Sequence, residues 1–600
     1  MYLIFDTETT GLPRDFKAPI TDTDNWPRCV QIAWQLHDEM GKLIESKDYL
    51  IQPEGYDIPY KAEEIHGIST DLAMEQGIPL KDMLIEFKEV LGRAKFIVGQ
   101  NLKFDTNVVG CEFVREELEN NLQQTPVLDT CTEDTAALCQ IPGGRGGKFK
   151  LPTLTELHQY LFNEPFGEAH NATADVEATT RCFLELIRLR NYTSTQLQQN
   201  EKYFTEFTQT NTSSFDKIGL KHLNLKAESE KIRKRKEAEE GGGEVYVDTT
   251  ENLKRLENVT FSHLHNHTQF SILESTTKVD ALIHKAAEFR MPAVGMTDRG
   301  NMMAAFHFVA AGANHNKGIK GKIKALEEKL LSGKITESSE NENGETIETE
   351  RDLKDSEIDS FRFDVEDLKQ QIVLPIVGSE FYVCKNHNDK SIKDNGYLVP
   401  MLAKNKNGYH NISRMSSAGH VEGFYYVPRI DKDVVEKFKE DVIVLTGGLD
   451  GEIPQMILNV GVKQAEDSFV WWHTTFGEDF YVELNRHGLD EEKLVNATLI
   501  KFAKKYGVKC IAANNNFYLE QESSVPHDIL MCVKAGEKQA TPIGRGRGFR
   551  SGMPNDNYFF KSQQEMKREF ADIPEAIENV AEIVAKCESY VLARDVLLPA

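Results

Sequence analysis

Apolar residues follow two alternating spacings through the first 190 residues of the chain. Short, β-prone apolar stretches predict strands at 1–5, 30–36 and 96–99. Apolar residues at helical spacing predict amphipathic helices at 80–91 and 175–189. Strands that alternate with helices indicate an α/β domain of ordinary size.

The same alternation returns near residue 256 and continues to residue 600. Further strands are expected at 293–297, 372–377, 442–445 and 508–513, with helices between them. We therefore expect a second domain, over 256–600, with a barrel-like β/α arrangement.

Two segments interrupt this pattern. Residues 191–255 combine Gln/Thr/Asn-rich sequence, a basic run at 231–236 and three glycines at 241–243, which predicts a linker that is helical only in its charged part. The basic run could contact DNA, but a solvated linker face is the favoured interpretation. Residues 316–370 are highly charged and poor in hydrophobic residues, which predicts a mobile surface insert.

The bulk composition limits the class of protein. Six hundred residues suggest two to four domains, and 40% hydrophobic with 28% charged residues is typical of a soluble globular protein. No apolar run approaches the roughly 20 residues that span a bilayer, so no membrane partner is expected. The N-terminus begins as a strand without a basic leader, and the nine cysteines include no CxxC pair. We expect a cytoplasmic protein with reduced thiols and no cysteine-based zinc site.

The net charge of −25 bears on nucleic-acid binding. Between Glu337 and Asp367, thirteen acidic residues face three basic ones, so one segment supplies about ten of the excess negative charges. Bound cations can also invert the sign of an acidic pocket. The charge argues against a broad duplex-binding surface, but it is compatible with a site that holds one strand end.

Four carboxylates in the first domain have the chemistry of a metal centre. Asp6 and Glu8 are two residues apart on a predicted strand, so both point to the same face. Asp105 follows another apolar strand, and Asp175 opens a helix whose dipole favours negative charge. If these groups converge, two Mg²⁺ or Mn²⁺ ions would relieve their repulsion and hold the attacking and leaving oxygens of a phosphodiester.

A histidine precedes the last of these carboxylates. His170 lies five residues before Asp175, in the loop that enters the helix. A neutral imidazole there suits a general base that takes a proton from the attacking water. Each motif alone has an ordinary explanation as a turn, a helix cap or a surface residue, and only their combination favours a nuclease.

The combination resembles the DEDDh family of 3′→5′ exonucleases, which includes the proofreading subunits of bacterial replicases. The resemblance rests on three motifs and a His-Gly-Ile segment, namely 5–11, 101–105, 170–175 and 66–68. It implies an RNase H-like fold, with Asp6, Glu8, Asp105 and Asp175 as metal ligands and His170 as the catalytic base. It also implies that His66 contacts the terminal nucleotide, and we assign Thr7 and Asn101 to substrate binding with it. The glycine-rich loop at 143–147 looks longer than the family pattern.

The second domain resembles the PHP domain of bacterial DNA polymerase III alpha subunits. The resemblance begins at the segment 261–268 and continues through 297–302, 375–380, 402–405, 419–429, 451–454 and 483–488. Metal-competent PHP domains hold about three ions in a cluster of His, Asp, Glu and Cys residues. The resemblance implies that four ligand positions are kept: His265, His267, Glu274 and Glu380. It also implies that five are replaced: Arg299, Tyr397, Gly448, Asn515 and Phe517.

Arg299 is the most informative of these replacements. A guanidinium cannot act as a metal ligand and repels cations. We therefore expect no metal in the PHP site, and we expect Arg299 to pair with Glu274 or Glu380 in a structural scaffold. A single residual ion at His265 and His267 is the alternative.

Together the two resemblances predict a proofreading exonuclease fused in front of a PHP domain, as the N-terminal part of a replicative polymerase. The expected partners are a DNA primer 3′ end and the remainder of the polymerase beyond Ala600. The segment 209–215 resembles a sliding-clamp peptide that is one residue too long, and ordinary polar linker is the favoured interpretation there. Two alternatives stay open: a general exonuclease acting on short RNA, and a non-catalytic tethering module.

Overall fold

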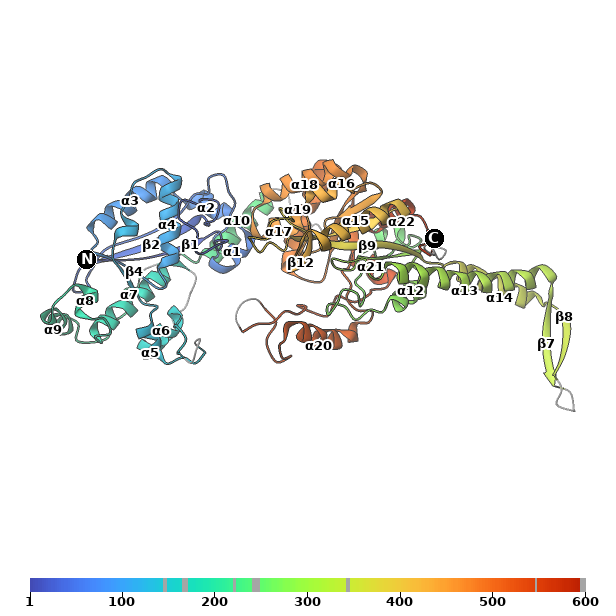
Figure 1. Cartoon of the computed structure of the whole chain (residues 1–600), viewed down its shortest axis with the longest axis horizontal. Helices are drawn as coiled ribbons and strands as arrows, with labels where there is room; N and C mark the ends of the chain where they lie inside the picture. Colours follow the sequence, from blue (N-terminus) through green and yellow to red (C-terminus); the bar gives the residue numbers. More distant parts are fainter. Residues whose placement is uncertain are drawn as a thin grey trace, which may run out of the picture. The chain divides into compact units, whose positions relative to one another are not determined.

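The computed structural model describes residues 1–143, 148–164, 171–219, 223–239, 249–340, 346–544 and 548–593. It divides into two compact units, coloured blue to green and green to red in Figure 1. The first unit comprises Met1–Val245 with Leu458–Gly461, and the second comprises Tyr246–Ile457 and Val462–Ala600.

The first unit is built on a five-stranded sheet in the order β3-β2-β1-β4-β5. Its strands are β1 (Tyr2–Thr9), β2 (Cys29–His37), β3 (Leu43–Leu50), β4 (Phe96–Gly99) and β5 (Val127–Asp129). β1, β2 and β3 are antiparallel, whereas β4 and β5 run parallel to β1. The predicted strands at 1–5, 30–36 and 96–99 are confirmed.

Helices cover both faces of this sheet, and alternation along β1 decides which residue meets which helix. Leu3 and Phe5 pack on one face with residues of α3 (Leu80–Arg93) and α4 (Lys103–Arg115). Tyr2 and Ile4 pack on the other face with residues of α7 (Ala172–Arg188). The remaining helices up to residue 162 are α1 (Tyr60–His66), α2 (Thr70–Gln76), η1 (Leu122–Gln124), α5 (Glu133–Cys139) and α6 (Leu154–Phe162). The two helices expected at 80–91 and 175–189 are therefore present.

The segment after residue 190 differs from the expected linker. α8 (Ser194–Leu197) and α9 (Glu201–Thr210) bury three aromatic side chains in the same apolar cluster as α7: Tyr203, Phe204 and Phe207. α10 (Leu225–Glu239) adds Leu225 and Ile232 to a smaller cluster with α1 and α2. These helices pack within the first compact unit although they lie in the segment predicted as a linker, because sparse apolar residues within polar sequence anchor them.

The basic run lies on α10 and pairs with acidic residues of the same unit. Lys236 is 2.6 Å from Asp71, and Arg233 and Arg235 pair with Glu63 and Glu75. The sequence favoured a basic run that faces solvent, but several of its side chains form ion pairs with acidic residues of the same unit.

The second unit contains a curled, half-barrel sheet of eight strands. The path is β11-β12-β9-β10-β13-β14-β15, with β6 paired to β9. The strands are β6 (Ala293–Met296), β9 (Leu374–Val383), β10 (Tyr397–Ala403), β11 (Phe424–Tyr425), β12 (Val427–Ile430), β13 (Val442–Leu445), β14 (Phe480–Asn485) and β15 (Cys510–Ala513). All four strands expected in this domain are present.

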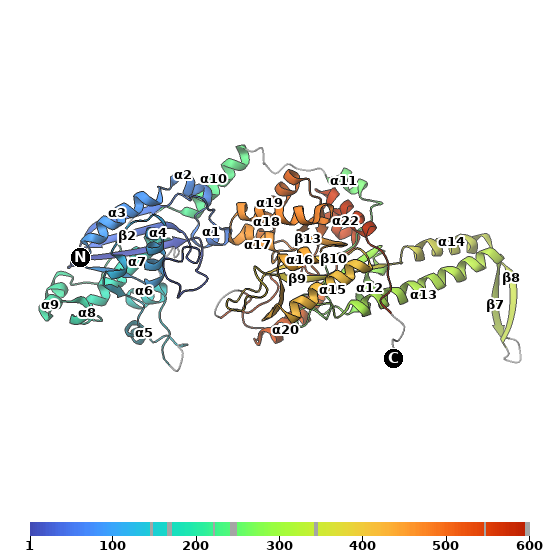
Figure 2. The same ribbon diagram turned by 45° about the horizontal axis from the view of Figure 1, so that its top comes forward.

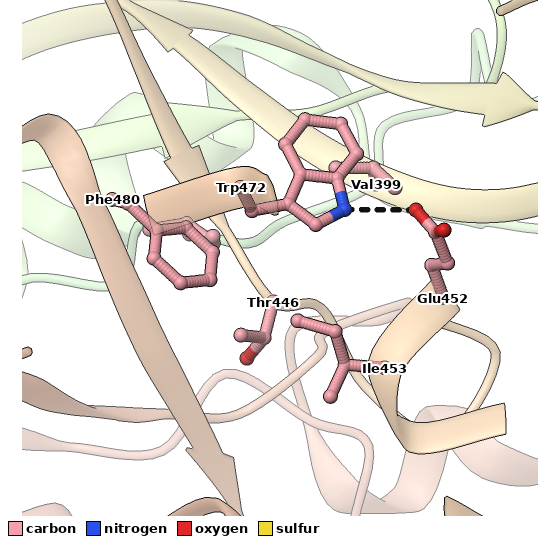
Figure 3. Close-up of a pocket in the computed structure, with 7 residues that line it drawn as sticks. Val399, Thr446, Glu452, Ile453, Trp472 and Phe480 are labelled. Atoms are coloured by element: carbon pink, nitrogen blue, oxygen red, sulfur yellow. Dashed lines mark hydrogen bonds between the residues drawn. The ribbon is translucent and has the colours of Figure 1, made fainter. Parts of the chain in front are cut away.

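Helices separate most of these strands. They are α11 (Thr249–Arg255), α12 (Val279–Glu288), α15 (Lys406–Val421), α16 (Lys432–Lys437), α17 (Glu452–Asn459), α18 (Val462–Phe476), η3 (Gly477–Asp479), α19 (Asp490–Tyr506), η4 (Gln521–Ser523), α20 (Ser524–Ala535), α21 (Gln563–Glu569) and α22 (Pro574–Lys586). Figure 3 shows the buried Trp472 indole N–H donating to Glu452 beside Val399 and Phe480, at 2.8 Å. Lys432 pairs with the other oxygen of Glu452, so this polar group inside the apolar core is fully paired.

The charged insert, which its composition predicts to be a mobile surface segment, forms an arm of helices and a hairpin in the residues that the structure describes. α13 (Ala305–Ser332) and α14 (Asp355–Lys369) run side by side beyond the sheet, with the hairpin of β7 (Lys334–Glu340) and β8 (Thr346–Asp352) at their far end (Figures 1 and 2). Ile319, Ile323 and Val365 form a small apolar core between the two helices. Within the described part of the chain, no helix has both the length and the apolar character of a membrane span.

Candidate active site

Three of the four predicted carboxylates meet at one end of β1. Asp6 and Glu8 follow Tyr2 and Ile4 on the face that α7 covers. Asp175 lies in the first turn of α7, where the side chain of the N-cap Asn171 accepts a hydrogen bond from the Thr173 N–H. One carboxylate oxygen from each of Asp6, Glu8 and Asp175 lies within 4.8 Å of the others, close enough to share a metal ion.

Asp105 reaches the same end of β1 from the opposite face. It is buried in the first turn of α4, which packs with Leu3 and Phe5. Its Oδ1 accepts hydrogen bonds from the Thr7 hydroxyl, at 2.7 Å, and from the Thr7 N–H, at 3.1 Å. Both Thr7 donors bind one oxygen of Asp105, so they fix the orientation of this carboxyl group.

The electrostatics of the cluster favour a bound cation. Burial, and then the charges of Asp175 and Asp105, raise the pKa of Glu8 to about 8. Burial and the neighbouring carboxylates also raise the pKa of Asp6 well above its ordinary value. The pKa of Asp105 rises to about 7 through burial, although the Thr7 hydrogen bonds oppose the rise. Mutual repulsion of this kind is removed when divalent cations bind between the carboxylates.

Asp129 is a residue that the sequence did not single out. It ends β5, and its two oxygens accept from the N–H groups of Asn101 and Leu102 at 2.8 and 2.9 Å. Asn101 has a φ of 59°, a left-handed conformation that needs support from its surroundings. Asp129 therefore holds the turn that leads into α4 and to Asp105. The only signal of this role in the sequence is a carboxylate at the end of a short apolar strand.

The remaining predicted residues of this site are placed as follows. His66 is buried at the end of α1, and its Nδ1 accepts from the Ile68 N–H at 3.1 Å. Asn101 is exposed in the turn before α4. His170 and residues 144–147 of the glycine-rich loop lie outside the described residues. The substrate contacts of Thr7, His66 and Asn101 stay predictions.

A second cluster of ionisable groups lies inside the second unit. His265 Nδ1 is 2.8 Å from Glu483 and its Nε2 is 3.3 Å from Glu380, while His267 Nε2 is 3.8 Å from Glu380. Ligand atoms of His265, His267 and Glu380 lie within 4.8 Å of one another, so this group also has the spacing of a metal site. All three residues are at most 2% exposed.

Arg299 enters this cluster as the sequence predicted, and it pairs with both candidate carboxylates. Its guanidinium is 2.7 Å from Glu380 and 2.7 Å from Glu274, and Lys534 also contacts Glu274. Burial alone would raise the pKa of Glu380, but Arg299 and the histidines hold it well below its usual range. Burial alone would lower the pKa of His265, but Glu483 and Glu380 outweigh burial and raise it to about 10. Three protein cations thus face the three carboxylates.

Three of the positions that the PHP resemblance gives as replaced ligands lie near the same cluster: Gly448, Asn515 and Phe517. The ring of Phe517 stacks on His267 with a centroid separation of 4.3 Å. A Cβ at Gly448 would lie 3.7 Å from the side chains of Asn485 and Asn515, so these positions face one another. Glu483 and Lys534 were not predicted as members of the site, because their partners are more than 200 residues away in the sequence.

Comparisons with known proteins identify the class of each unit. Residues 3–183 match an exonuclease family model, and residues 263–487 match the PHP domain model. The chain therefore joins an exonuclease domain to a PHP domain, as the sequence motifs predicted.

The similar curated proteins are more specific. DNA polymerase III subunit alpha of Borreliella burgdorferi is 30% identical over 334 residues, which cover 55% of this chain and 24% of that protein. The same subunit of Campylobacter jejuni is 29% identical over 340 residues, covering 54% of this chain and 23% of that protein. The chain is homologous to DNA polymerase III alpha subunits, and it spans about a quarter of the length of these relatives.

Solved structures of E. coli exonuclease I also match. A zinc-bound complex with single-stranded DNA is 22% identical and covers 34% of this chain and 42% of that chain, with a TM-score of 0.26. A dA16 complex is 21% identical and covers 36% and 45%, with a TM-score of 0.27.

Proposed function

We propose that the first unit is a DEDDh-type 3′→5′ exonuclease that removes nucleotides from mismatched DNA primer ends. One observation carries this proposal: Asp6, Glu8 and Asp175 converge within 4.8 Å, and Asp105 is held beside them by Thr7. The match to an exonuclease family and the homology to replicative polymerase subunits support the same assignment.

The donor set fits two Mg²⁺ or Mn²⁺ ions. All four groups are carboxylates, the ligands that hard divalent cations prefer. The raised pKa values of Asp6, Glu8 and Asp105 indicate that these three groups resist ionising together. Asp6, Glu8, Asp105 and Asp175 would hold the ions. When bound, such ions stabilise the charge that develops on the attacking and leaving oxygens.

The protein groups have separate tasks in this mechanism. Thr7 donates two hydrogen bonds to one oxygen of Asp105 and so positions this carboxyl group. We assign the removal of a proton from the attacking water to His170, which is five residues before Asp175 in the sequence. A mismatched end reaches the site more readily than a paired one, because an unpaired nucleotide costs less to unstack.

The test uses a 5′-labelled primer with a matched or mismatched 3′ end, annealed to a template. With Mg²⁺, we expect a ladder of primers shortened from the 3′ end, formed faster on the mismatched primer. Asp175→Asn preserves the size of the side chain and should abolish shortening. A 3′-terminal phosphorothioate should slow the wild-type reaction, which controls for the direction of attack.

The alternatives predict different outcomes in the same assay. Faster degradation of a short RNA oligomer than of the mismatched primer would identify a general exonuclease. Unchanged shortening by an Asp6→Ala, Glu8→Ala variant would remove the catalytic role of this cluster. A purified wild-type chain without activity on any end would favour a tethering module.

We also propose that the second unit is a scaffold without resident metal, in a polymerase whose remaining domains are its partners. The support is charge balance: Arg299, Lys534 and His265 are paired with Glu274, Glu380 and Glu483. Because Arg299 binds Glu380, it competes directly with a cation for one of the three possible ligands. Elemental analysis of the Asp6→Ala, Glu8→Ala variant, which lacks two of the exonuclease ligands, should find less than stoichiometric zinc and manganese after mild chelation, and a stoichiometric ion in that variant would refute the scaffold.

A sliding clamp is the least supported partner. Phe215, the aromatic residue of the candidate clamp segment, packs against Phe207 at a ring separation of 6.1 Å. Its carbonyl also accepts a hydrogen bond from Arg181 at 3.0 Å. These contacts favour a role for Phe215 in anchoring the segment after α9.

A further inference from the structure

A row of lysines runs along the solvent-facing side of the arm helix α13. Lys317, Lys320 and Lys324 are exposed and lie at i, i+3 and i+7. With about 100° of rotation per residue, they fall within an arc of about 60° and span about 10 Å of the helix axis. The buried residues Ile319 and Ile323 face α14 from the other side of the helix.

Most of these charges are not used within the protein. In the described part of the chain, ion pairs reach only Lys324, which is 3.7 Å from Glu328. α13 carries five lysines and two glutamates, whereas α14 carries six acidic and two basic residues. The arm therefore presents one basic helix and one acidic helix in a chain with a net charge of −25.

Two glycines lie beside the lysine row. Gly318 and Gly321 are both inside α13, where glycine is among the least favourable helix residues. A Cβ at either position would have no neighbour within 4 Å, so packing within the protein does not require glycine there. On a helical projection they lie between the lysine row and Lys322, another exposed lysine. Because Gly318 and Gly321 have no side chains, a ligand backbone can approach the helix closely between the flanking lysines.

The base of the arm is fixed, so the row has a defined direction relative to the second unit. The Asn316 side chain donates to the Val373 carbonyl at 2.8 Å and accepts from the Val373 N–H at 3.0 Å. His315 contacts the Gln371 carbonyl at 2.9 Å. Both contacts join the start of the lysine row to the strand that leads back into the sheet.

We propose that this face of α13 binds the phosphate backbone of duplex DNA. The partner is chosen by charge, because a row of exposed lysines, of which only Lys324 has an ion pair in the described part of the chain, suits the dense negative charge of the duplex backbone. We expect the contact to be independent of sequence, because lysine contacts to phosphates carry no sequence information. The lysine row belongs to the second unit, whereas the exonuclease residues belong to the first, and the row is narrow enough to agree with the acidic character of the chain.

The test measures binding of the full chain to a fluorescent duplex whose two ends are closed by hairpin loops. This probe has no 3′ end for the nuclease, and EDTA keeps the exonuclease site inactive. Anisotropy titrations at several salt concentrations give the slope of log affinity against log salt. The variant is K317A/K320A/K324A, and the matched control is K390A/K463A/K504A, three exposed lysines elsewhere on the second unit.

We expect the arm variant to bind more weakly and to lose about 2.7 from the magnitude of the salt slope, as for three phosphate contacts at about 0.9 each. The control should match the wild type, and circular dichroism should show equal helix content in all three proteins. An unchanged affinity and slope for the arm variant, or an equal loss in the control, would overturn the proposal. Binding of an acidic polypeptide in place of the duplex would overturn it as well, since it would identify a protein partner.

Discussion

Arg299 allows the scaffold in the second unit to be tested quantitatively. Its side chain is 16% exposed, and it bridges Glu380, which is 2% exposed, to Glu274, which is 11% exposed. Replacing it by alanine leaves two buried carboxylates without their shared cation. The perturbation is therefore electrostatic in origin, with a smaller loss of packing.

The expected loss of unfolding free energy depends on which cations Glu380 and Glu274 keep after Arg299 is removed. Breaking a buried ion pair by removing one partner costs about 3–5 kcal/mol. Glu380 keeps His265 at 3.3 Å and Glu274 keeps Lys534, so the lower end, about 3 kcal/mol, is expected for Arg299→Ala. Arg299→Lys is the matched control, because it keeps the charge but cannot hold both carboxylates, and it should cost about half as much.

The assay is urea unfolding of the full chain in EDTA, followed by circular dichroism and by tryptophan fluorescence. The free energy of unfolding of the double variant R299A/E380Q should exceed that of R299A by more than about 1 kcal/mol, because the unpaired Glu380 carboxylate has been replaced by a neutral amide. Exonuclease activity of the first unit should be unchanged in all variants, which controls for general misfolding.

The pH dependence provides a second readout. The pKa of Glu380 in the folded protein is held below its ordinary value of 4.5, so its stabilising contribution is present above about pH 4.5 and is lost as the pH falls below it. The penalty of Arg299→Ala should therefore be largest near neutral pH and shrink in acid. A penalty below about 1 kcal/mol at pH 7, or one that does not change between about pH 7 and about pH 3, would refute the reasoning.

Three further predictions concern other residues. Asp129→Ala should lower kcat more than it raises KM, with partial rescue by Asp129→Asn; equal losses of activity and thermal stability in both variants would contradict a positioning role. Phe215→Ala should destabilise the first unit by about 1–2 kcal/mol, because the ring is only partly buried, and should leave binding to a sliding clamp unchanged; loss of clamp binding would revive the clamp segment. The folded pKa of His265 is raised to about 10, so its contribution is complete below pH 6.5 and is lost as the pH rises towards 10. Melting temperatures in EDTA should therefore fall over that range in the wild type but not in His265→Gln, and a flat wild-type profile would contradict the protonated histidine.

Local patterns predicted much of the fold, and the errors share one cause. Strands and helices with dense apolar periodicity were located to within a few residues. The linker was misjudged, because Leu225 and Ile232 are isolated apolar residues that become core only when α10 docks on its own unit. The insert was misjudged in the same way, since its small core combines Ile319 and Ile323 with Val365 from the other helix.

For the candidate sites too, the local sequence showed the residue types, whereas the tertiary structure decided which of them meet. The order and type of the carboxylates were visible in the sequence, because each occurs at a strand end or a helix start. Their meeting depends on tertiary structure: Asp175 approaches β1 on the face of Glu8, and Asp105 approaches from the opposite face. Asp129 could not be identified, because its function depends on two backbone N–H groups of a distant turn.

By itself, the sequence determined the two domain classes, the order of the carboxylates in the first unit and the presence of an arginine at position 299, since these are properties of residue type and local order. Only the tertiary structure decided which carboxylates lie close enough to share a cation, which charges balance one another around Arg299, and which lysines are left facing solvent. The physical reason is that pairing energies depend on distance and burial, and both are set by packing between segments that are hundreds of residues apart.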